Sequence, residues 1–338
     1  MMSTRVFFLL VSLVFVYAAS FAAEPVKIIL DTDMLTDPED TNALCLLHAF
    51  ADKGEAEILA VVCNGHDTNR ASGAAVDTIN TFHGRPDIPI GTYKGEHTTR
   101  KARSPITVQL RDKFPHKAPN DDELPNAVDV LRKTLAAQPD RSVAVVSLGH
   151  LDNMRVLLDS KPDQYSELTG KELVRKKMKL FSVMGGKYPQ GKEHNFYQGG
   201  TGPTTKYVVE NFPDEVPIVF SGYEIGRGII SGKKYSEQLP ASPLRTALES
   251  NYNAINQGRY SWDQTSVIFA VRGNAYQGRE YWKLHTKGSV LVNKDGSNTW
   301  VETPEKNQSY LVESAPPDVL AELMEEMLLE CINNVLKK

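Results

Sequence analysis

The segment from Val26 to Leu47 places a buried strand directly before a helix, with a run of acidic residues between them. Its apolar positions 28–30 are typical of a strand in a parallel sheet, and positions 43–47 are typical of the buried side of a helix. In an open α/β sheet, ligands bind at the edge where strands end and helices begin. The acidic residues expected at that edge are Asp31, Asp33, Asp37, Glu39 and Asp40.

Helix capping is one interpretation of these acids. Asp37 before Pro38 suits an N-cap with proline at the first helical position. Glu39 and Asp40 would then fall in the first turn, where the helix dipole favours negative charge. Capping explains one or two acids and not the whole run, because crowded carboxylates raise one another's pKa values unless a cation neutralises them. The run therefore favours a metal site with oxygen ligands, for which Ca²⁺ is the first expectation and Mg²⁺ the second.

The first 23 residues have the pattern of a secretory signal peptide. Arg5 precedes an apolar segment, Val6 to Ala19, and small residues follow as far as Ala23. The apolar segment is short for a membrane span, so we expect no stable span after cleavage and a mature protein that is periplasmic or secreted. The remaining residues, 24–338, contain no linker-like stretch or repeat and are expected to form one domain.

Composition restricts the class of partner. The chain has 338 residues, of which 41% are apolar and 24% charged, and a net charge of −4, which is typical of a folded globular protein. Nucleic-acid binding needs a basic face, so the mild negative charge argues against that partner and fits a small-molecule ligand. The chain has three cysteines, Cys45, Cys63 and Cys331. An odd number argues against a disulfide framework, although a single disulfide bridge stays possible on sequence alone.

Two stretches interrupt the alternation of strands and helices. Residues 96–120 are polar with scattered basic side chains, and we expect a surface excursion or lid there and not a packed element. Residues 288–302 predict a small β-hairpin, because two strand-like runs flank the turn Asp295-Gly296. Both stretches are expected to be insertions in the same domain.

The motif DTDMLTDPEDTNAL, at 31–44, resembles the N-terminal signature of the nucleoside hydrolases of the inosine-uridine preferring type. It is similar to a longer variant, with two extra residues between the paired acids and the following ones. The resemblance implies a mostly parallel sheet flanked by helices, with a Rossmann-like core. It also implies one Ca²⁺ per chain and hydrolysis of the N-glycosidic bond of a ribonucleoside or related riboside. Members of the family are commonly dimers or tetramers, so a homo-oligomer is expected.

Two later segments resemble the family's remaining calcium ligands. Residues 149–153, GHLDN, stand where the family has Gly-Pro-Leu-Thr-Asn, whose Thr offers a main-chain carbonyl to calcium; Asp152 occupies that position. Asp263 opens an apolar helix, as does a calcium-binding aspartate of the family. The resemblance implies that the base is Asp37 or Glu39. The implied metal ligands are Asp33, Asp37, Asp40, Asp152 and Asp263.

The segment 191–197, GKEHNFY, resembles the family's Glu-Phe-Asn-Phe segment, whose Glu and Asn hydrogen-bond the sugar hydroxyls. The resemblance assigns these roles to Glu193 and Asn195. His194 replaces an aromatic residue between them and is a further candidate for substrate binding. A solvated charge among lysines is the alternative interpretation of Glu193.

A polar loop, 64–67, follows the second predicted strand, 57–63. In the family, a polar loop in this place touches the sugar. Asn64 and His66 are therefore candidate substrate-binding residues. An exposed turn is the alternative interpretation.

The chain departs from the family directly before Asp263. Relatives often carry a His there, which is proposed to protonate a leaving purine, and this chain has Trp262. The family's general-acid route therefore cannot be transferred to this position. Trp262 is expected instead to bind substrate through its flat apolar face.

Two other functions stay open on sequence alone. A haloacid-dehalogenase-like, Mg²⁺-dependent phosphatase also begins with strand-Asp-x-Asp, but Leu35 stands where that family has Thr or Val, and no clear Gly-Asp-x-x-x-Asp follows. A non-catalytic, metal-dependent sugar-binding protein is the other, and the missing His at Trp262 favours it. Release of ribose, release of phosphate or release of neither would distinguish the three.

Overall fold

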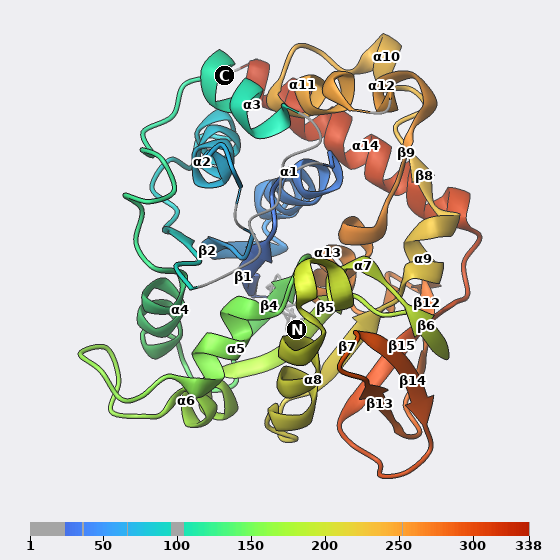
Figure 1. Cartoon of the computed structure of the whole chain (residues 1–338). Helices are drawn as coiled ribbons and strands as arrows, with labels where there is room; N and C mark the ends of the chain where they lie inside the picture. The colour runs from blue at the N-terminus through green and yellow to red at the C-terminus, as the bar shows by residue number, and fades with distance from the viewer. Residues whose placement is uncertain (1–23, 36, 66, 96–104, 252, 338) are drawn as a thin grey trace, which may run out of the picture.

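A mostly parallel sheet runs through the protein (Figure 1). The structure is a computed structural model and describes residues 24–35, 37–65, 67–95, 105–251 and 253–337. The strand order is β12-β15-β7-β5-β4-β1-β2-β3, and all neighbours are parallel except β12 and β15. The strands are β1 Val26–Thr32, β2 Ala56–Cys63, β3 Ile90–Thr92, β4 Val143–Ser147, β5 Met178–Met184, β7 Ile218–Ser221, β12 Trp282–His285 and β15 Gln308–Glu313.

Helices cover both faces of this sheet (Figure 1). The alternation of side chains along β1 divides the core, because Ile28 and Leu30 pack on one face and Ile29 on the other. The first face carries α1 Glu39–Asp52, α2 Ser72–Phe82, α3 Ile106–Lys113, α11 Pro243–Ser250, α13 Trp262–Arg272 and α14 Pro317–Leu336. The second carries α4 Ala127–Ala136, α5 Asp152–Asp159, α6 Gly170–Lys177 and α8 Gly202–Asn211. The predicted α/β class, a mostly parallel sheet flanked by helices, is confirmed.

The predicted hairpin near the C-terminus is also confirmed. β13 (Ser289–Val292) pairs antiparallel with β14 (Ser297–Val301), and Gly296 in the turn has a φ of +80°, which glycine adopts without strain. β6 (Gln190–Lys192) adds a third strand beside β14. The hairpin therefore holds the backbone directly before Glu193.

The polar stretch after β3 is in part a packed element. Helix α3 buries Ile106 and Leu110 against α2 and α11, so the expectation of an unpacked excursion is wrong for this part. Two apolar side chains four positions apart lie on one side of a helix, and they anchor it although most of its other residues are polar. Residues 96–104 lie outside the described ranges.

The remaining elements are short and lie mainly between β5 and the last strands. Several of them form the loops at the carboxyl-terminal edge of the sheet. They are α7 His194–Tyr197, a 3₁₀ turn Gln198–Gly200, α9 Tyr223–Gly228, β8 Ile230–Ser231, α10 Tyr235–Gln238, α12 Ala254–Gln257, β9 Arg259–Tyr260, β10 Ala275–Tyr276 and β11 Arg279–Glu280.

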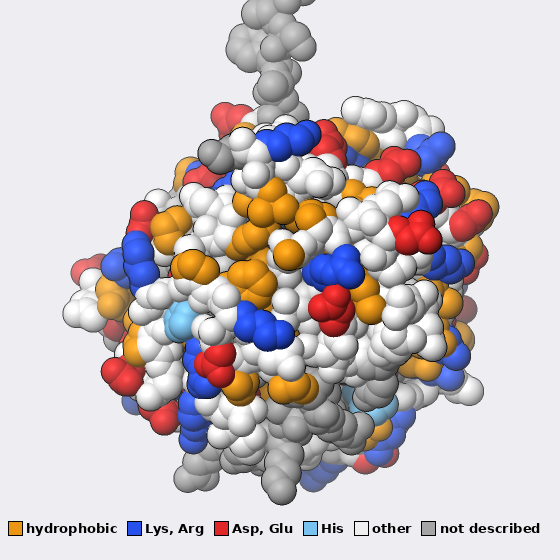
Figure 2. All heavy atoms as spheres, turned by 90° about the horizontal axis from the view of Figure 1, so that it is seen from above, with side chains coloured by type: hydrophobic (Ala, Val, Ile, Leu, Met, Phe, Trp, Pro, Cys, Tyr) orange, Lys and Arg blue, Asp and Glu red, His pale blue; other side chains and the backbone are white. Residues whose placement is uncertain are grey.

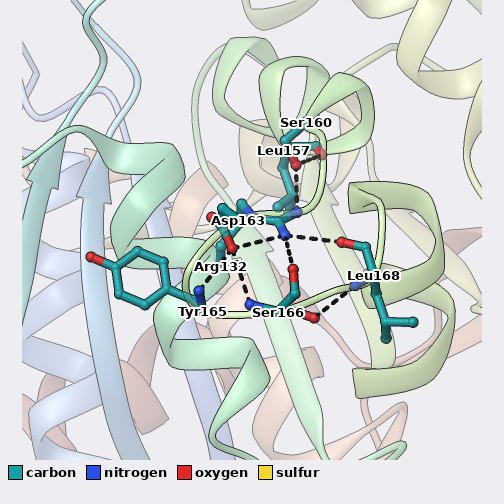
Figure 3. Close-up of polar contacts among 7 residues, drawn as sticks. All are labelled: Arg132, Leu157, Ser160, Asp163, Tyr165, Ser166 and Leu168. Carbon is teal, nitrogen blue, oxygen red and sulfur yellow. Dashed lines mark hydrogen bonds and ion pairs between the residues drawn. The ribbon is translucent and has the colours of Figure 1, made fainter.

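A buried arginine fixes the loop after α5 (Figure 3). Arg132, on α4, is 2% exposed and binds both carboxylate oxygens of Asp163 at 2.6 and 3.0 Å. It also donates to the Ser160 hydroxyl and to the carbonyls of Ser166 and Leu168. A bidentate pair with all these acceptors satisfies the buried charge. The network therefore ties the end of α5 to α4, and α5 begins at Asp152, near the ligand-binding edge.

The predicted signal peptide lies outside the described residues, and so does His66. Within the described ranges, no helix combines the length and the apolar character needed to cross a bilayer. The chain's three cysteines, all within those ranges, are buried and form no disulfide. Figure 2 shows the face turned upward in Figure 1, where the described basic and acidic side chains are interspersed around a group of hydrophobic ones.

Candidate active site

A cavity of about 640 Å³ lies at the carboxyl-terminal edge of the sheet. Its walls come from the loops after β1, β4, β5 and β7 and from the start of α13, which is the edge that the sequence predicts for a ligand site. Among the described residues that line it, six are carboxylates and one is a guanidinium, Arg259. The carboxylates are Asp33, Asp37, Glu39, Asp40, Glu193 and Asp263.

Asp33 follows directly after β1 and is enclosed by two glycines. A Cβ on Gly149 would lie 2.7 Å from the Asp33 Cβ, and a Cβ on Gly65 would lie 3.3 Å from it. The first of these distances is too short for any real contact. The loops after β2 and β4 therefore close on Asp33 because they carry glycine at these two positions.

Asp40 lies in the first turn of α1 and is buried. It accepts a hydrogen bond from the Thr32 hydroxyl at the end of β1. Burial raises the pKa of Asp40 well above its ordinary value, and the charge of Asp33 raises it further. Asp40 and Asp33 are thus close enough to repel each other.

Asp263 joins this group from the other end of the chain. It lies in the first turn of α13 and is 5% exposed. Burial raises its pKa well above the ordinary value, and the charges of Asp40, Glu39 and Asp33 contribute next. The structure therefore brings together the two acidic segments that the sequence analysis joined by resemblance.

Asp37 and Glu39 line the same cavity, but both are hydrogen-bonded to the positively charged side chain of an arginine. Arg259 donates its Nε–H to Glu39 Oε1 at 2.6 Å and an Nη2–H to Asp37 Oδ1 at 3.3 Å. Asn251 also donates to Asp37 Oδ1. Burial raises the pKa of Glu39 to about 8, although the charge of Arg259 lowers it. Helix α1 has Pro38 as its N-cap, without a side-chain cap, so the interpretation of Asp37 as an N-cap is wrong.

Glu193 and Asn195 reach the cavity from the turn of α7. Glu193 is buried and accepts the N–H of Asn195 at 2.9 Å and the N–H of Gly186 at 3.1 Å. Burial raises its pKa to about 7. The Asn195 side chain donates to the carbonyls of Leu148 and Met184, at the ends of β4 and β5. His194 is exposed and also lines the cavity.

Two predicted residues are not among the described residues that line the cavity. Asn64 is fully buried behind the cavity, where its Nδ2 donates to Asp31 Oδ1 at 3.0 Å and its Oδ1 accepts the N–H of His150. Asp152 is buried at the start of α5 and is not among the described lining residues. His66 lies outside the described residues. Asp31 itself accepts hydrogen bonds from Asn64 and Asn153, so it belongs to this buried network. Burial raises the pKa of Asp31 to about 8.

Trp262 and Tyr223 form an aromatic wall on the cavity. Their ring centroids lie 5.3 Å apart and the planes are inclined by 28°. The Trp262 indole N–H donates to the Tyr223 carbonyl at 2.7 Å. A Cβ on Gly226 would lie 2.3 Å from the Trp262 Cα, so α9 and α13 can approach this closely because residue 226 is glycine.

Arg259 and Tyr223 are lining residues that the sequence analysis did not select, as are Leu35, Leu148, Met184, Gln198 and Gly199. Arg259 lies 220 positions from Glu39 and 222 from Asp37, so no local spacing indicates their contact. Tyr223 follows β7, and its place directly after an apolar run typical of a strand is the one signal that could have identified it.

The chain matches no protein-family model and no curated protein. Solved structures match it over most of its length. A purine-preferring ribonucleoside hydrolase from Gardnerella vaginalis superposes with a TM-score of 0.64 at 16% identity, over 91% of this chain and 99% of that chain. An inosine-guanosine nucleoside hydrolase gives 0.67 at 14% identity, over 91% and 98%. The effector protein XopQ, complexed with adenosine diphosphate ribose, gives 0.65 at 13% identity, over 92% and 95%. The chain therefore has the fold of the nucleoside hydrolases.

Proposed function

We propose that the protein is a calcium-dependent hydrolase that cleaves the N-glycosidic bond of a ribonucleoside or a related riboside and releases base and ribose. One observation carries the proposal: carboxylates from both ends of the chain line a single cavity together with the aromatic wall of Tyr223 and Trp262. The fold supports it, because the structures that superpose on the chain include nucleoside hydrolases.

The donor atoms in the cavity fit a hard cation. Burial raises the pKa of Asp263 and the charge of Asp40 raises it further, and such crowding is relieved when a divalent cation neutralises the carboxylates. In the described part of the chain, no three His, Cys, Asp or Glu side chains are already spaced as a metal cage, so the fit rests on the chemistry of the donors. All are oxygens, which Ca²⁺ prefers. The proposed ligands are the side chains of Asp33, Asp40 and Asp263, which line the cavity. The resemblance adds the main-chain carbonyl of Asp152, which is not among the described lining residues.

When bound, Ca²⁺ would orient the sugar diol and make a water molecule easier to deprotonate. The water's proton would pass to Asp37 or Glu39, which line the same cavity. Glu193 would accept a sugar hydroxyl, because two main-chain N–H groups fix its carboxylate. Asn195 would offer its amide oxygen, because its amide nitrogen is bound to the carbonyls of β4 and β5.

Attack at the anomeric carbon develops positive charge on the sugar ring, as in other glycosidases, and surrounding carboxylates stabilise that charge. The nucleobase of the substrate would lie against Trp262, whose ring plane is fixed by its hydrogen bond to Tyr223. Its indole N–H is already donated and has no useful acidity. Protonation of the leaving group therefore does not come from position 262, and His194, which lines the cavity, is the candidate acid among the described residues.

The experiment measures free ribose from inosine, with CaCl₂ and with a chelator, using the mature protein. We expect release with calcium and none with the chelator. Release of phosphate from a phosphate ester, without ribose from inosine, would overturn the proposal in favour of a phosphatase. Binding of inosine without release of ribose would overturn it in favour of a sugar-binding protein.

A further inference from the structure

We propose that His150 is a positioning residue, whose imidazole ring holds the sugar-binding turn, residues 193–195, in register with the ends of β1 and β4. This inference rests on the proposed function, in which Glu193 and Asn195 bind the sugar. His150 lies on the loop between β4 and α5 and is 2% exposed. It is not among the described residues that line the cavity, so it acts through the turn and not on the substrate.

The ring of His150 donates a hydrogen bond to the main chain of the turn. Its Nδ1 lies 2.9 Å from the carbonyl oxygen of Asn195. A carbonyl oxygen can only accept a hydrogen bond, so Nδ1 carries a proton in this contact. The Thr201 hydroxyl lies 3.5 Å from the same nitrogen but 3.0 Å from the carbonyl of Gln198, to which it donates. The contact with Asn195 therefore fixes both the protonated nitrogen of the ring and the place of the carbonyl.

The main chain of His150 is bonded to the buried network at β1. Its N–H donates to Asn64 Oδ1 at 3.1 Å, and Asn64 Nδ2 donates to Asp31 Oδ1 at 3.0 Å. The preceding residue, Gly149, lies against Asp33, because a Cβ at Gly149 would be 2.7 Å from the Asp33 Cβ. The backbone of His150 is thus anchored beside β1, and its ring reaches from there to the turn.

Asn195 is the residue at which the supports of the turn meet. Its side chain donates to the carbonyls of Leu148 and Met184, at the ends of β4 and β5. Its N–H donates to Glu193 Oε1 at 2.9 Å, and its carbonyl accepts the ring of His150. A one-turn helix such as α7 leaves most of its carbonyls without a donor inside the helix, and the ring of His150 supplies one. Loss of this donor would let Asn195 shift, and the carboxylate of Glu193 would move with it.

A purely structural role makes a different prediction. If the ring of His150 only filled space, a folded His150→Leu protein would bind the sugar as wild type does. If the ring positions the turn, the same protein loses affinity for ribose. It should keep its affinity for Ca²⁺, because every variant retains the main-chain N–H of residue 150. His150→Asn should restore ribose binding, because the Asn side chain carries an N–H donor on Cγ, where the imidazole carries Nδ1.

The test measures ribose affinity by isothermal titration calorimetry in saturating CaCl₂, and Ca²⁺ affinity without ribose, with thermal melting to report the fold. We expect His150→Leu to bind ribose about tenfold more weakly than wild type and to keep its Ca²⁺ affinity within about threefold. His150→Asn should stay within about threefold of wild type for ribose. His48→Leu is the matched control, since His48 is also buried and bonded at 2.9 Å, to Asn80, and does not line the cavity. It should bind ribose as wild type does.

A folded His150→Leu protein with wild-type ribose affinity overturns the inference, and so does a His150→Asn protein that loses as much affinity as His150→Leu. If His150→Leu does not fold, nitrogen NMR of the wild-type histidines decides, with His150→Asn to assign the signal. A protonated Nδ1 supports the inference, and a bare Nδ1 overturns it. In each case a wild type that releases ribose from inosine in calcium leaves the proposed function intact, whereas a wild type that neither binds nor releases ribose overturns both.

Discussion

Trp262 donates its indole N–H to the main-chain carbonyl of Tyr223 across 2.7 Å, and the two rings stack beside the candidate active site. The bond fixes the plane of the indole, because rotation of the ring would leave a partly buried carbonyl without its donor. It also places the start of α13 against α9, and the next residue along α13 is Asp263. A single contact thus positions both the aromatic wall and a proposed metal ligand.

Trp262→Ala should weaken binding of the nucleoside. Stacking of a base on an aromatic side chain contributes about 1–3 kcal/mol, so we expect KM to rise roughly 5- to 150-fold. Trp262→Phe keeps a flat ring and should retain most of the affinity. Steady-state kinetics with inosine measure both effects. Equal kinetics for wild type and Trp262→Ala would show that the nucleobase does not lie against this ring.

Gly149→Ala should displace Asp33. Its new Cβ would lie 2.7 Å from the Asp33 Cβ and 2.6 Å from Asn64 Oδ1, so one of these groups must move. Misplacement of a reacting group by about 1 Å costs about 100-fold in rate, and we expect kcat/KM to fall by that order with weaker Ca²⁺ binding. Gly228→Ala is the control, because its Cβ would come no nearer than 3.4 Å to Pro317. Wild-type calcium affinity in a folded Gly149→Ala protein would contradict the placement of Asp33.

A second polar cluster, between α1 and α2, requires a neutral histidine. His48 is fully buried and stacks on His83 with ring centroids 4.5 Å apart. Its Nε2 bonds to Asn80 Oδ1, an acceptor, and its Nδ1 lies 3.3 Å from Arg85, a donor. The ring must therefore carry one proton, on Nε2. Burial lowers the pKa of His48 well below 6.5, and the charges of His83 and Arg85 lower it further.

This cluster predicts that stability falls at acid pH. Below pH 6.5 the unfolded chain binds a proton at His48 that the folded protein does not, so the free energy of unfolding decreases as pH falls. The contribution is about 1.4 kcal/mol per pH unit until the folded pKa is reached. Urea unfolding of wild type and His48→Gln at pH 5.5 and 7.5 isolates it from the carboxylates of the active site. We expect the variant to lose this part of the pH dependence, and an unchanged dependence would show that His48 takes up a proton in the folded state.

The sequence predicted the sheet, and the edge of the sheet where the acidic residues line a cavity, because those signals are local. The apolar residues of β1, the acidic residues after it and the start of α1 all lie within one short stretch of sequence. The turn at Gly296 likewise indicates the hairpin from neighbouring residues. Asp263 came from a family resemblance, and it lines the same cavity as Asp40.

What the sequence did not predict depends on contacts between distant residues. Asp31 and Asp33 were both expected at the ligand edge of the sheet, but Asp31 accepts hydrogen bonds from Asn64 and Asn153 and is not among the described residues that line the cavity. Asn64 is therefore a structural partner in this arrangement, and local polarity cannot reveal that. Arg259 reaches Glu39 across 220 positions, and only the packing of β9 against β8 brings it there.

The central claim is that calcium held by carboxylates from both ends of the chain is required for riboside hydrolysis. Asp263→Asn tests it most directly, since the substitution keeps the shape of the side chain and removes its charge. Asp318→Asn is the matched control, because Asp318 also lies in the first turn of a long helix but is exposed.

The decisive measurement is a calcium titration of ribose release by Asp263→Asn, with calorimetric Ca²⁺ affinity measured on the same protein. We predict that calcium affinity falls about 100-fold or more, and that ribose release falls with it and recovers in part at high calcium. Asp318→Asn should match wild type in both. An Asp263→Asn protein that keeps wild-type calcium affinity, or that releases ribose at the wild-type rate in chelator, would contradict the account.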